Sequence, residues 1–243
     1  MNIIMKSHNI MKSIYSKSSN KIKKLAFVDF DGTLVKSDIV HASMWFLFGL
    51  PNSTSKFIRI ILFIMIAPML VTMFTVNIKN FDSNEASKLM YFFLFNGISY
   101  KDAMHSVNKF SYKFEKFINK KVIDMLKDKD VYIISGNSHI FIGKYCNKYG
   151  FNYVTSTFGF DNNQQKYTAN NMDICLGKRK AEHALNIMNK YKKAGHQIET
   201  YGFGNSLDDI EMLKIVDHAY AINPFKNFVK ELKKHPEIEI IKC

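Results

Sequence analysis

Two carboxylates, two positions apart, follow the first apolar run of this sequence. The run Leu25 to Val28 ends at Asp29, and Asp31 comes after one intervening residue. Side chains two apart on an extended chain point to the same side, so both carboxylates crowd one spot. An aspartate followed by glycine is also typical of an ordinary turn or helix cap. Because two close like charges are costly unless a cation lies between them or one holds a proton, the pair favours a site with a nucleophile, a proton donor and a divalent cation.

Polar residues also follow the later apolar runs of the chain. From residue 121 onward, short β-rich runs alternate with helical ones, which predicts a parallel sheet with helices on both faces. The ligand site of such a sheet lies at the carboxyl ends of its strands. Phosphoryl transfer needs the residue types found there, because the charge on the transferred group must be neutralised. The expected strand-end and helix-start residues are Ser135, Gly136 and Asn137, then Gly177 to Lys180, and then Gly204, Asn205, Ser206, Asp208 and Asp209.

The chain resembles the haloacid dehalogenase superfamily, in the branch of phosphoserine phosphatase-like hydrolases. Four motifs occur in the order of that family, and the resemblance covers about residues 24 to 230. The motifs are "DFDGTL" from Asp29, the strand-end Ser135, "CLGKRKAEHAL" from Cys175 and "GNSLDDIEML" from Gly204. The resemblance implies an α/β fold, with a Rossmann-like parallel core and an inserted helical cap domain.

The resemblance also implies catalytic roles. Asp29 would attack phosphorus and become an aspartyl-phosphate. Asp31 would protonate the leaving oxygen and then activate water. Ser135 would hydrogen-bond a phosphoryl oxygen, and Lys180 would neutralise charge on Asp29 and the phosphate. Lys178 is the alternative lysine if the third motif is aligned differently.

Substrate and metal ligands follow from the same resemblance. Mg²⁺ is the expected cofactor, because its preferred ligands are oxygens of the kind that these motifs supply. The expected metal ligands are Asp29, Asp31, Asn205 and Asp209, and the expected substrate-binding residues are Ser135, Gly136, Lys180 and Asp38.

Asn205 departs from the family pattern, because an aspartate usually stands at this position. Its amide oxygen can still bind Mg²⁺, but one negative charge is missing. Two alternatives follow. The chain is either an active enzyme with weaker metal binding, or a catalytically decayed, membrane-associated binding protein.

Three segments are expected along the chain. Residues 1–23 are Lys-rich and contain no acid, which predicts a flexible basic arm; an organelle transit peptide is the alternative. Residues 24–40 and 121–243 form the predicted catalytic core, and residues 41–120 the predicted apolar helical cap.

The run from Ile60 to Val76 carries no charge and contains Pro68 near its middle. Two buried or half-buried helices that meet near this proline are the favoured interpretation. An apolar lid that touches a membrane surface is the second, and a spanning helix is the third.

Charge and cap composition limit the partners. The net charge of +13 favours anionic partners, but the only arginines are Arg59 and Arg179, and no nucleic-acid-binding motif is present. The setting of Arg59, "KFIRIILF", does not match the segment with which phosphoserine phosphatases grip their substrate. The apolar cap better suits a phospholipid head group or another phosphorylated amphiphile than a free amino acid. We therefore expect a cytoplasmic protein with peripheral membrane contact and a phosphorylated small molecule or lipid as its substrate.

Overall fold

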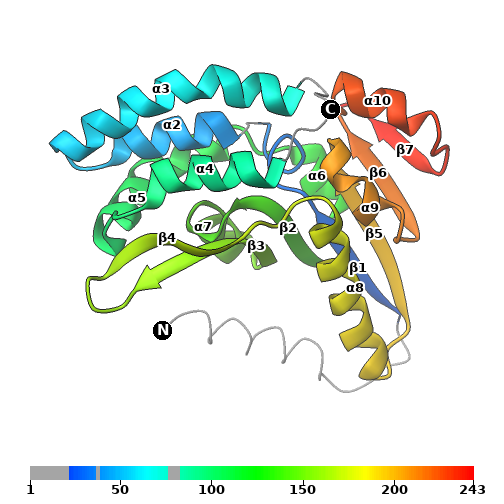
Figure 1. The fold of residues 1–243 in the computed structure, drawn as a ribbon. Coiled ribbons are helices and arrows are strands. Elements are labelled where there is room, and N and C mark those ends of the chain that lie inside the picture. Colours follow the sequence, from blue (N-terminus) through cyan, green and yellow to red (C-terminus); the bar gives the residue numbers. More distant parts are fainter. Residues whose placement is uncertain (1–21, 37–38, 76–82) are drawn as a thin grey trace.

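A seven-stranded sheet lies at the centre of the structure, a computed structural model that describes residues 22–36, 39–75 and 83–243 (Figure 1). Its strand order is β4-β3-β2-β1-β5-β6-β7, and every neighbouring pair except β3 and β4 is parallel. The strands are β1 (Lys23–Val28), β2 (Asp130–Ser138), β3 (Asn152–Asp161), β4 (Lys166–Asp173), β5 (Ile198–Gly204), β6 (His218–Ile222) and β7 (Ile238–Ile241).

Helices cover both faces of this sheet. Leu25 and Phe27 of β1 pack with α8 (Lys178–Lys193) and α9 (Ile210–Leu213), and α10 (Lys226–Leu232) packs beside α9. Ala26 and Val28 belong to the core under α6 (Lys120–Met125) and α7 (His139–Tyr149). All four of these β1 side chains are completely buried, as the two-residue period of a strand requires when both faces are covered. The predicted fold class is therefore confirmed.

Five described helices lie between β1 and β2 in the chain, and the four that precede α6 form the insert. These four are α2 (Ile39–Gly49), α3 (Thr54–Thr75), α4 (Ser83–Phe95) and α5 (Tyr100–Glu115), and in Figure 1 α2, α3 and α4 stack above the sheet. Aromatic side chains join this insert to the core, because Phe95 of α4 stacks on Phe158 of β3 and also contacts Phe141 of α7. The cap boundaries at residues 41 and 120 stay a prediction. The basic arm, apart from Ile22 and Lys23, and Asp38 lie outside the described residues.

The favoured interpretation of the apolar run is wrong. Thr54 to Thr75 form one continuous helix with Pro68 inside it, rather than two helices that meet at the proline. A proline removes one backbone hydrogen bond of a helix, and Pro68 lies on the exposed side, where water can satisfy the carbonyl that loses its partner. Within the described parts of the chain, none of the helices combines the length and the apolar character that crossing a lipid bilayer requires.

A β-hairpin that the sequence did not predict joins the core sheet to the helical insert. β3 and β4 pair in antiparallel fashion, whereas the sequence predicted a parallel sheet. Backbone hydrogen bonds connect this hairpin to the segment between α4 and α5. Gly97 donates to the carbonyl of Tyr167, Tyr167 donates back to Ile98, and Tyr100 donates to Gln165, at 2.8 to 2.9 Å.

A buried lysine holds the turn between α2 and α3. The ammonium of Lys56 donates to the carbonyl oxygens of Phe48 and Leu50 and to Oδ1 of Asn52, at 3.0, 2.9 and 3.1 Å. These carbonyls lie at the end of α2, where a helix has no internal donors left for them. The cation also complements the negative end of the helix dipole.

Lys56→Met is expected to lower the free energy of unfolding by about 2 kcal/mol, because three acceptors lose the donor that they share. Equilibrium urea denaturation measures this change. Lys127→Met is the control, since this lysine is exposed and forms a surface ion pair with Asp124, and it is expected to cost less than ~0.5 kcal/mol. A cost at Lys56 as small as that of the control would contradict the capping role.

Candidate active site

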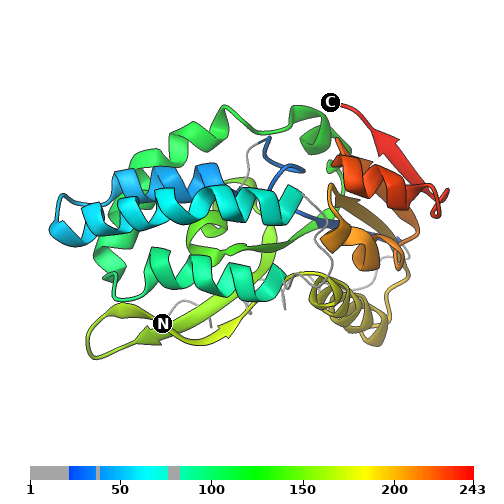
Figure 2. The ribbon, with the colours of Figure 1, turned by 45° about the horizontal axis from the view of Figure 1, so that its top comes forward.

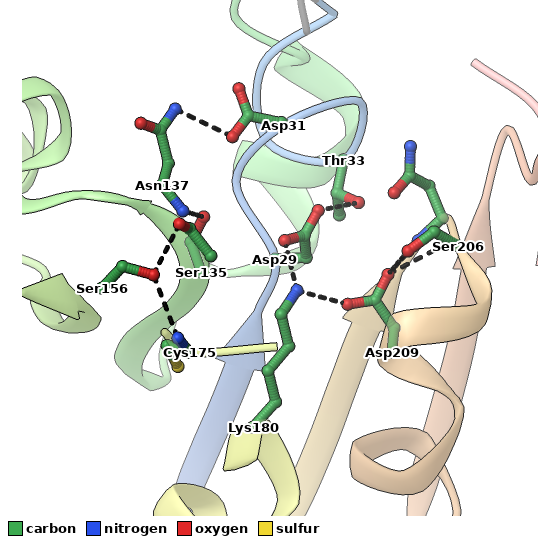
Figure 3. A network of polar contacts seen from close by, with 12 residues as sticks. Asp29, Asp31, Thr33, Ser135, Asn137, Ser156, Cys175, Lys180, Ser206 and Asp209 are labelled. Carbon is green, nitrogen blue, oxygen red and sulfur yellow. Dashed lines mark hydrogen bonds and ion pairs between the residues drawn. The ribbon is translucent and has the colours of Figure 1, made fainter. Parts of the chain in front are cut away.

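Lys180 connects the two strand ends at the centre of the sheet (Figure 3). It comes from the first turn of α8, is 2% exposed, and its Nζ lies 2.7 Å from Oδ1 of Asp29 and 2.6 Å from Oδ1 of Asp209. Asp29 directly follows β1, and Asp209 lies in the short helix η1 (Leu207–Asp209) after β5. One buried cation is therefore shared by two buried carboxylates.

Burial and charge act in opposite directions on these groups. Burial raises the pKa of the Asp29 carboxyl above its ordinary value, while the ammonium of Lys180 lowers it. Burial alone would lower the pKa of Lys180, but the two carboxylates raise it well above its ordinary value. The lysine consequently stays charged at neutral pH and compensates the negative charge of the site.

Asp209 also fixes the loop after β5. Its Oδ2 accepts hydrogen bonds from the backbone N–H groups of Asn205 and Ser206 and from the Ser206 hydroxyl, at 2.9 to 3.0 Å. Gly204 is needed for this arrangement, because a Cβ there would collide with the Asp209 side chain. With Lys180 on its other oxygen, Asp209 holds the lysine and the loop in place.

Asp31 and Ser135 are brought together by Asn137, a residue that was expected at this strand end but given no role. Asn137 donates its side-chain amide to Oδ2 of Asp31 at 2.9 Å, and its backbone N–H donates to Oγ of Ser135 at 3.0 Å. Because Ser135 accepts this bond, the hydrogen of its hydroxyl can point to a ligand. Ser135 does not start α7, since the cap of that helix is Ser138, which accepts from Ile140.

The turn after β1 packs against the loop after β5. Gly32 has a φ of 75°, a backbone conformation that favours glycine, and a Cβ there would collide with the side-chain amide of Asn205. Asn205 is 4% exposed, so its side chain is enclosed beside this turn. Thr33 closes the turn by donating from Oγ1 to Oδ2 of Asp29 at 3.2 Å.

The donor set at this place fits Mg²⁺. Among the described residues, no group of three or more His, Cys, Asp or Glu side chains is arranged to hold a metal ion. A metal site here would therefore depend on mixed oxygen donors: the Asp29 carboxylate, the backbone carbonyl of Asp31 and the amide oxygen of Asn205. Hard oxygen ligands with few charges suit Mg²⁺, which binds through one or two carboxylates.

The helical insert reaches this site through Tyr91 of α4. The hydroxyl of Tyr91 donates to the carbonyl oxygen of Gly136, which also accepts from Oγ of Ser156 at 2.6 Å. Burial raises the pKa of Tyr91, and the negative charge of nearby Asp31 raises it further. A Cβ on Gly136 would collide with Leu176, so this loop is packed tightly on both sides.

The predicted residues divide clearly by position. Asp29, Asp31, Ser135 with Gly136, Lys180, Asn205 and Asp209 all lie at the carboxyl ends of the central strands or in the first turn of α8. Lys178, the alternative lysine, is exposed, and Arg59 of the insert donates to the carbonyl of Asn96. Asp38 is outside the described residues.

Four residues that contact the site were given no role from the sequence. Thr33 and Asn137 stand within or beside the motifs, and the spacing of Asn137 two residues after the strand-end serine was the available signal. Tyr91 and Ser156 belong to no motif, because their contacts join segments 45 and 20 residues from Gly136. No local sequence pattern marks contacts of this kind.

Solved structures show the same fold at low sequence identity. A protein of unknown function from Bordetella pertussis Tohama I superposes with a TM-score of 0.69 at 14% identity, covering 91% of this chain and 99% of that one. A phosphoserine phosphatase captured as an analogue of its phospho-aspartyl intermediate gives 0.61 at 18%, covering 90% and 94%. A substrate-bound phosphoserine phosphatase gives 0.58 at 16%, covering 88% and 98%.

The sequence itself matches one family. A comparison with curated proteins finds no matching sequence. The haloacid dehalogenase-like hydrolase family, however, matches residues 26–214, which include Asp29, Ser135, Lys180 and Asp209. The chain therefore belongs to the haloacid dehalogenase-like hydrolases, as the order of its four motifs predicted.

Proposed function

We propose that the chain is a Mg²⁺-dependent phosphomonoester hydrolase that works through an aspartyl-phosphate on Asp29. The substrate is a phosphorylated small molecule or a phospholipid head group, and peripheral membrane contact accompanies the second case. The observation that carries the proposal is the buried lysine bridge between Asp29 and Asp209. It supports a site that can accept an anionic phosphoryl group, because the fixed positive charge of Lys180 offsets negative charge there.

The residues of the site divide the two chemical steps between them. In the first step a carboxylate oxygen of Asp29 forms a bond to phosphorus, while the bond to the leaving oxygen breaks and Asp31 gives that oxygen a proton. In the second step Asp31 takes a proton from water, the water oxygen bonds to phosphorus, and the Asp29 carboxylate is released. Asn137 positions the Asp31 carboxyl for both transfers.

Several groups of the site can stabilise the negative charge of the phosphoryl group. Lys180 supplies a fixed positive charge, and the hydroxyl of Ser135 donates a hydrogen bond to a phosphoryl oxygen, with Gly136 beside it. Mg²⁺, bound by Asp29, the Asp31 carbonyl and Asn205, would neutralise further negative charge when present. We assign Asp209 an indirect role toward the metal, because both of its oxygens are engaged by Lys180 and the 205–206 loop.

The contacts of Arg59 favour a substrate other than free phosphoserine. Its guanidinium donates to the Asn96 carbonyl at the end of α4, so it is used to hold the insert together. Near Asp31 the insert instead supplies an aromatic side chain, Tyr91, whose ring lies against that of Phe158. An apolar leaving group fits these surroundings better than an amino acid.

The second candidate function is a catalytically decayed, membrane-associated binding protein. The neutral Asn205 at the metal site favours it, because the missing charge weakens Mg²⁺ binding. Hydrolysis of a generic aryl phosphate with and without Mg²⁺ separates the two functions. Turnover that requires Mg²⁺ supports the enzyme, and a complete lack of turnover supports the binding protein. A panel of phosphomonoesters that includes lipids then identifies the substrate.

Asp29→Asn is expected to abolish turnover while the protein stays folded. An amide cannot form the acyl-phosphate, and residues that act as a unit fail together, so the rate should fall by roughly a thousandfold or more. The loss of one carboxylate leaves Lys180 paired with Asp209, so the circular dichroism spectrum should match that of the parent. Near-normal turnover of an aryl phosphate in this variant would exclude the mechanism.

Lys180→Met is expected to remove activity and also to lower the free energy of unfolding by about 3–5 kcal/mol, because it leaves two buried carboxylates uncompensated. Lys178→Met, two residues earlier on an exposed position, should change neither property appreciably. Urea denaturation and aryl phosphate turnover are measured for both variants. Loss of activity in the Lys178 variant alone would show that the third motif is aligned wrongly.

Asn205→Asp is expected to lower the Mg²⁺ concentration needed for half-maximal rate, since ligand charge is a main determinant of affinity for hard cations. The same variant should show a larger Mg²⁺-induced rise in melting temperature, which reports binding without catalysis. Asn163→Asp, in the exposed turn between β3 and β4, is the matched control for added charge and should leave both titrations unchanged.

Asp209→Asn should raise the Mg²⁺ concentration needed for half-maximal rate, and by more than Asn205→Asp lowers it. If Asn205→Asp changes neither the rate titration nor the melting titration, position 205 does not contact the metal. If only Asn205→Asp is active, the natural protein is a decayed phosphatase.

A further inference from the structure

The outward side of α3 carries an uninterrupted apolar stripe. Its members recur at helical spacing, so they lie along one face of the helix. The five side chains from Phe57 to Met65 in this stripe are 52% to 71% exposed, whereas exposed apolar residues on protein surfaces normally occur singly rather than in rows. The stripe consists of Phe57, Ile58, Ile61, Ile64 and Met65, with Pro68 exposed at its end.

The two cations near the start of α3 are turned away from this stripe. Lys56 is 8% exposed and directs its ammonium to the end of α2. Arg59 is half-buried and donates to Ser55 and to the Asn96 carbonyl. The face from Phe57 to Pro68 is therefore free of charged groups, although the first turns of the helix contain both Lys56 and Arg59.

The position of α3 leaves this face open. In Figure 1 it is the helix farthest from the sheet, and in Figure 2, where the top of the molecule comes forward, it lies in front, between α2 and α4. A helix of 22 residues is about 33 Å long. The stripe from Phe57 to Pro68, roughly 18 Å of this helix, can lie against a planar surface without moving the sheet or the site.

Charge complementarity indicates which surface fits. Residues 39–81 contain no Asp or Glu, so this part of the chain does not repel anionic head groups. The whole chain carries a net charge of +13, which attracts it to an anionic membrane. An apolar face on a basic protein is the combination that holds helices in the interfacial plane of a bilayer.

We propose that the outward face of α3 is a peripheral membrane-binding surface that inserts into the interface of an anionic bilayer. The binding itself does not require catalysis. Its use, which is to bring a lipid phosphomonoester to Asp29, rests on the proposed phosphatase function.

Flotation of the full chain with lipid vesicles tests the surface. The parent should float with vesicles of phosphatidylcholine and phosphatidylglycerol, and less with phosphatidylcholine alone or at high salt. Ile61→Gln combined with Met65→Gln should weaken partitioning roughly tenfold or more, because two large apolar side chains no longer enter the bilayer. Leu185→Gln combined with Val229→Gln, also at exposed helical positions, is the matched control and should float like the parent.

Three outcomes would contradict the proposal that the outward face of α3 binds membranes. They are a parent that does not float, an Ile61/Met65 variant that floats as well as the parent, and equal flotation with and without anionic lipid. Protein that resists carbonate extraction would instead indicate a spanning helix. Analytical ultracentrifugation that shows a dimer in the parent and a monomer in the variant, without vesicle binding, would assign the face to a second copy of the chain.

Activity measurements keep the two proposals apart. Turnover of a water-soluble aryl phosphate should be the same in the parent and in the Ile61/Met65 variant, because neither residue belongs to the site. Flotation without any turnover would reject the proposed function and leave the surface standing. Turnover without flotation would reject the surface alone.

Discussion

The ammonium of Lys180, enclosed between Asp29 and Asp209, is the contact on which the rest of the structure depends. It ties the start of α8 to the ends of β1 and β5, so three separate segments meet at one charge. Without the ammonium, the two buried carboxylates would repel each other. Without the carboxylates, burying the ammonium would cost free energy. The sheet supplies the rigid frame, because β1 is covered on both faces and pairs with β2 and β5 along its length. The charged centre is thus both a structural joint and the candidate reaction centre.

Much of this arrangement was predictable because it is encoded locally. The apolar run before Asp29, the strand-end Ser135 and the helix that begins near Lys180 each occupy a few consecutive residues, and parallel strands bring their ends to one edge. Lys180 and Lys178 were distinguished only by motif spacing, and the structure places Lys180 beside Asp29. The family match over residues 26–214 confirms the family, while the chemical roles of the residues stay predictions.

The parts that sequence reasoning missed depend on distant contacts. Tyr91 of the insert contacts Gly136, and no sequence pattern near either residue predicts this contact. β4 was missed because its sequence, Lys166 to Asp173, is mostly polar, and its pairing with β3 rather than an apolar pattern makes it a strand. Pro68 was taken as a helix break because it removes a backbone hydrogen bond. On the exposed side of a long helix, the loss of one backbone hydrogen bond costs little. Packing against α2 and α4 therefore keeps the helix continuous through Pro68.

The β3–β4 hairpin has a mechanical consequence for the helical insert. The chain enters and leaves the insert side by side, where Lys36 donates to Phe117 and Val35 pairs with Ile118. A body attached at two adjacent points can swing about the line between them. The hydrogen bonds between residues 97–100 and 165–167 form a third attachment that is remote from these two in the chain, and it resists that swing.

Any opening of the insert must either break these hydrogen bonds or carry the hairpin along. In the second case the sheet would have to bend, and its regular pairing is already interrupted between Ser135 and Ser138 and between Thr157 and Gly159. The first of these interruptions coincides with the strand end that carries Ser135 and Asn137, so the act of admitting a ligand would itself displace the groups that receive it.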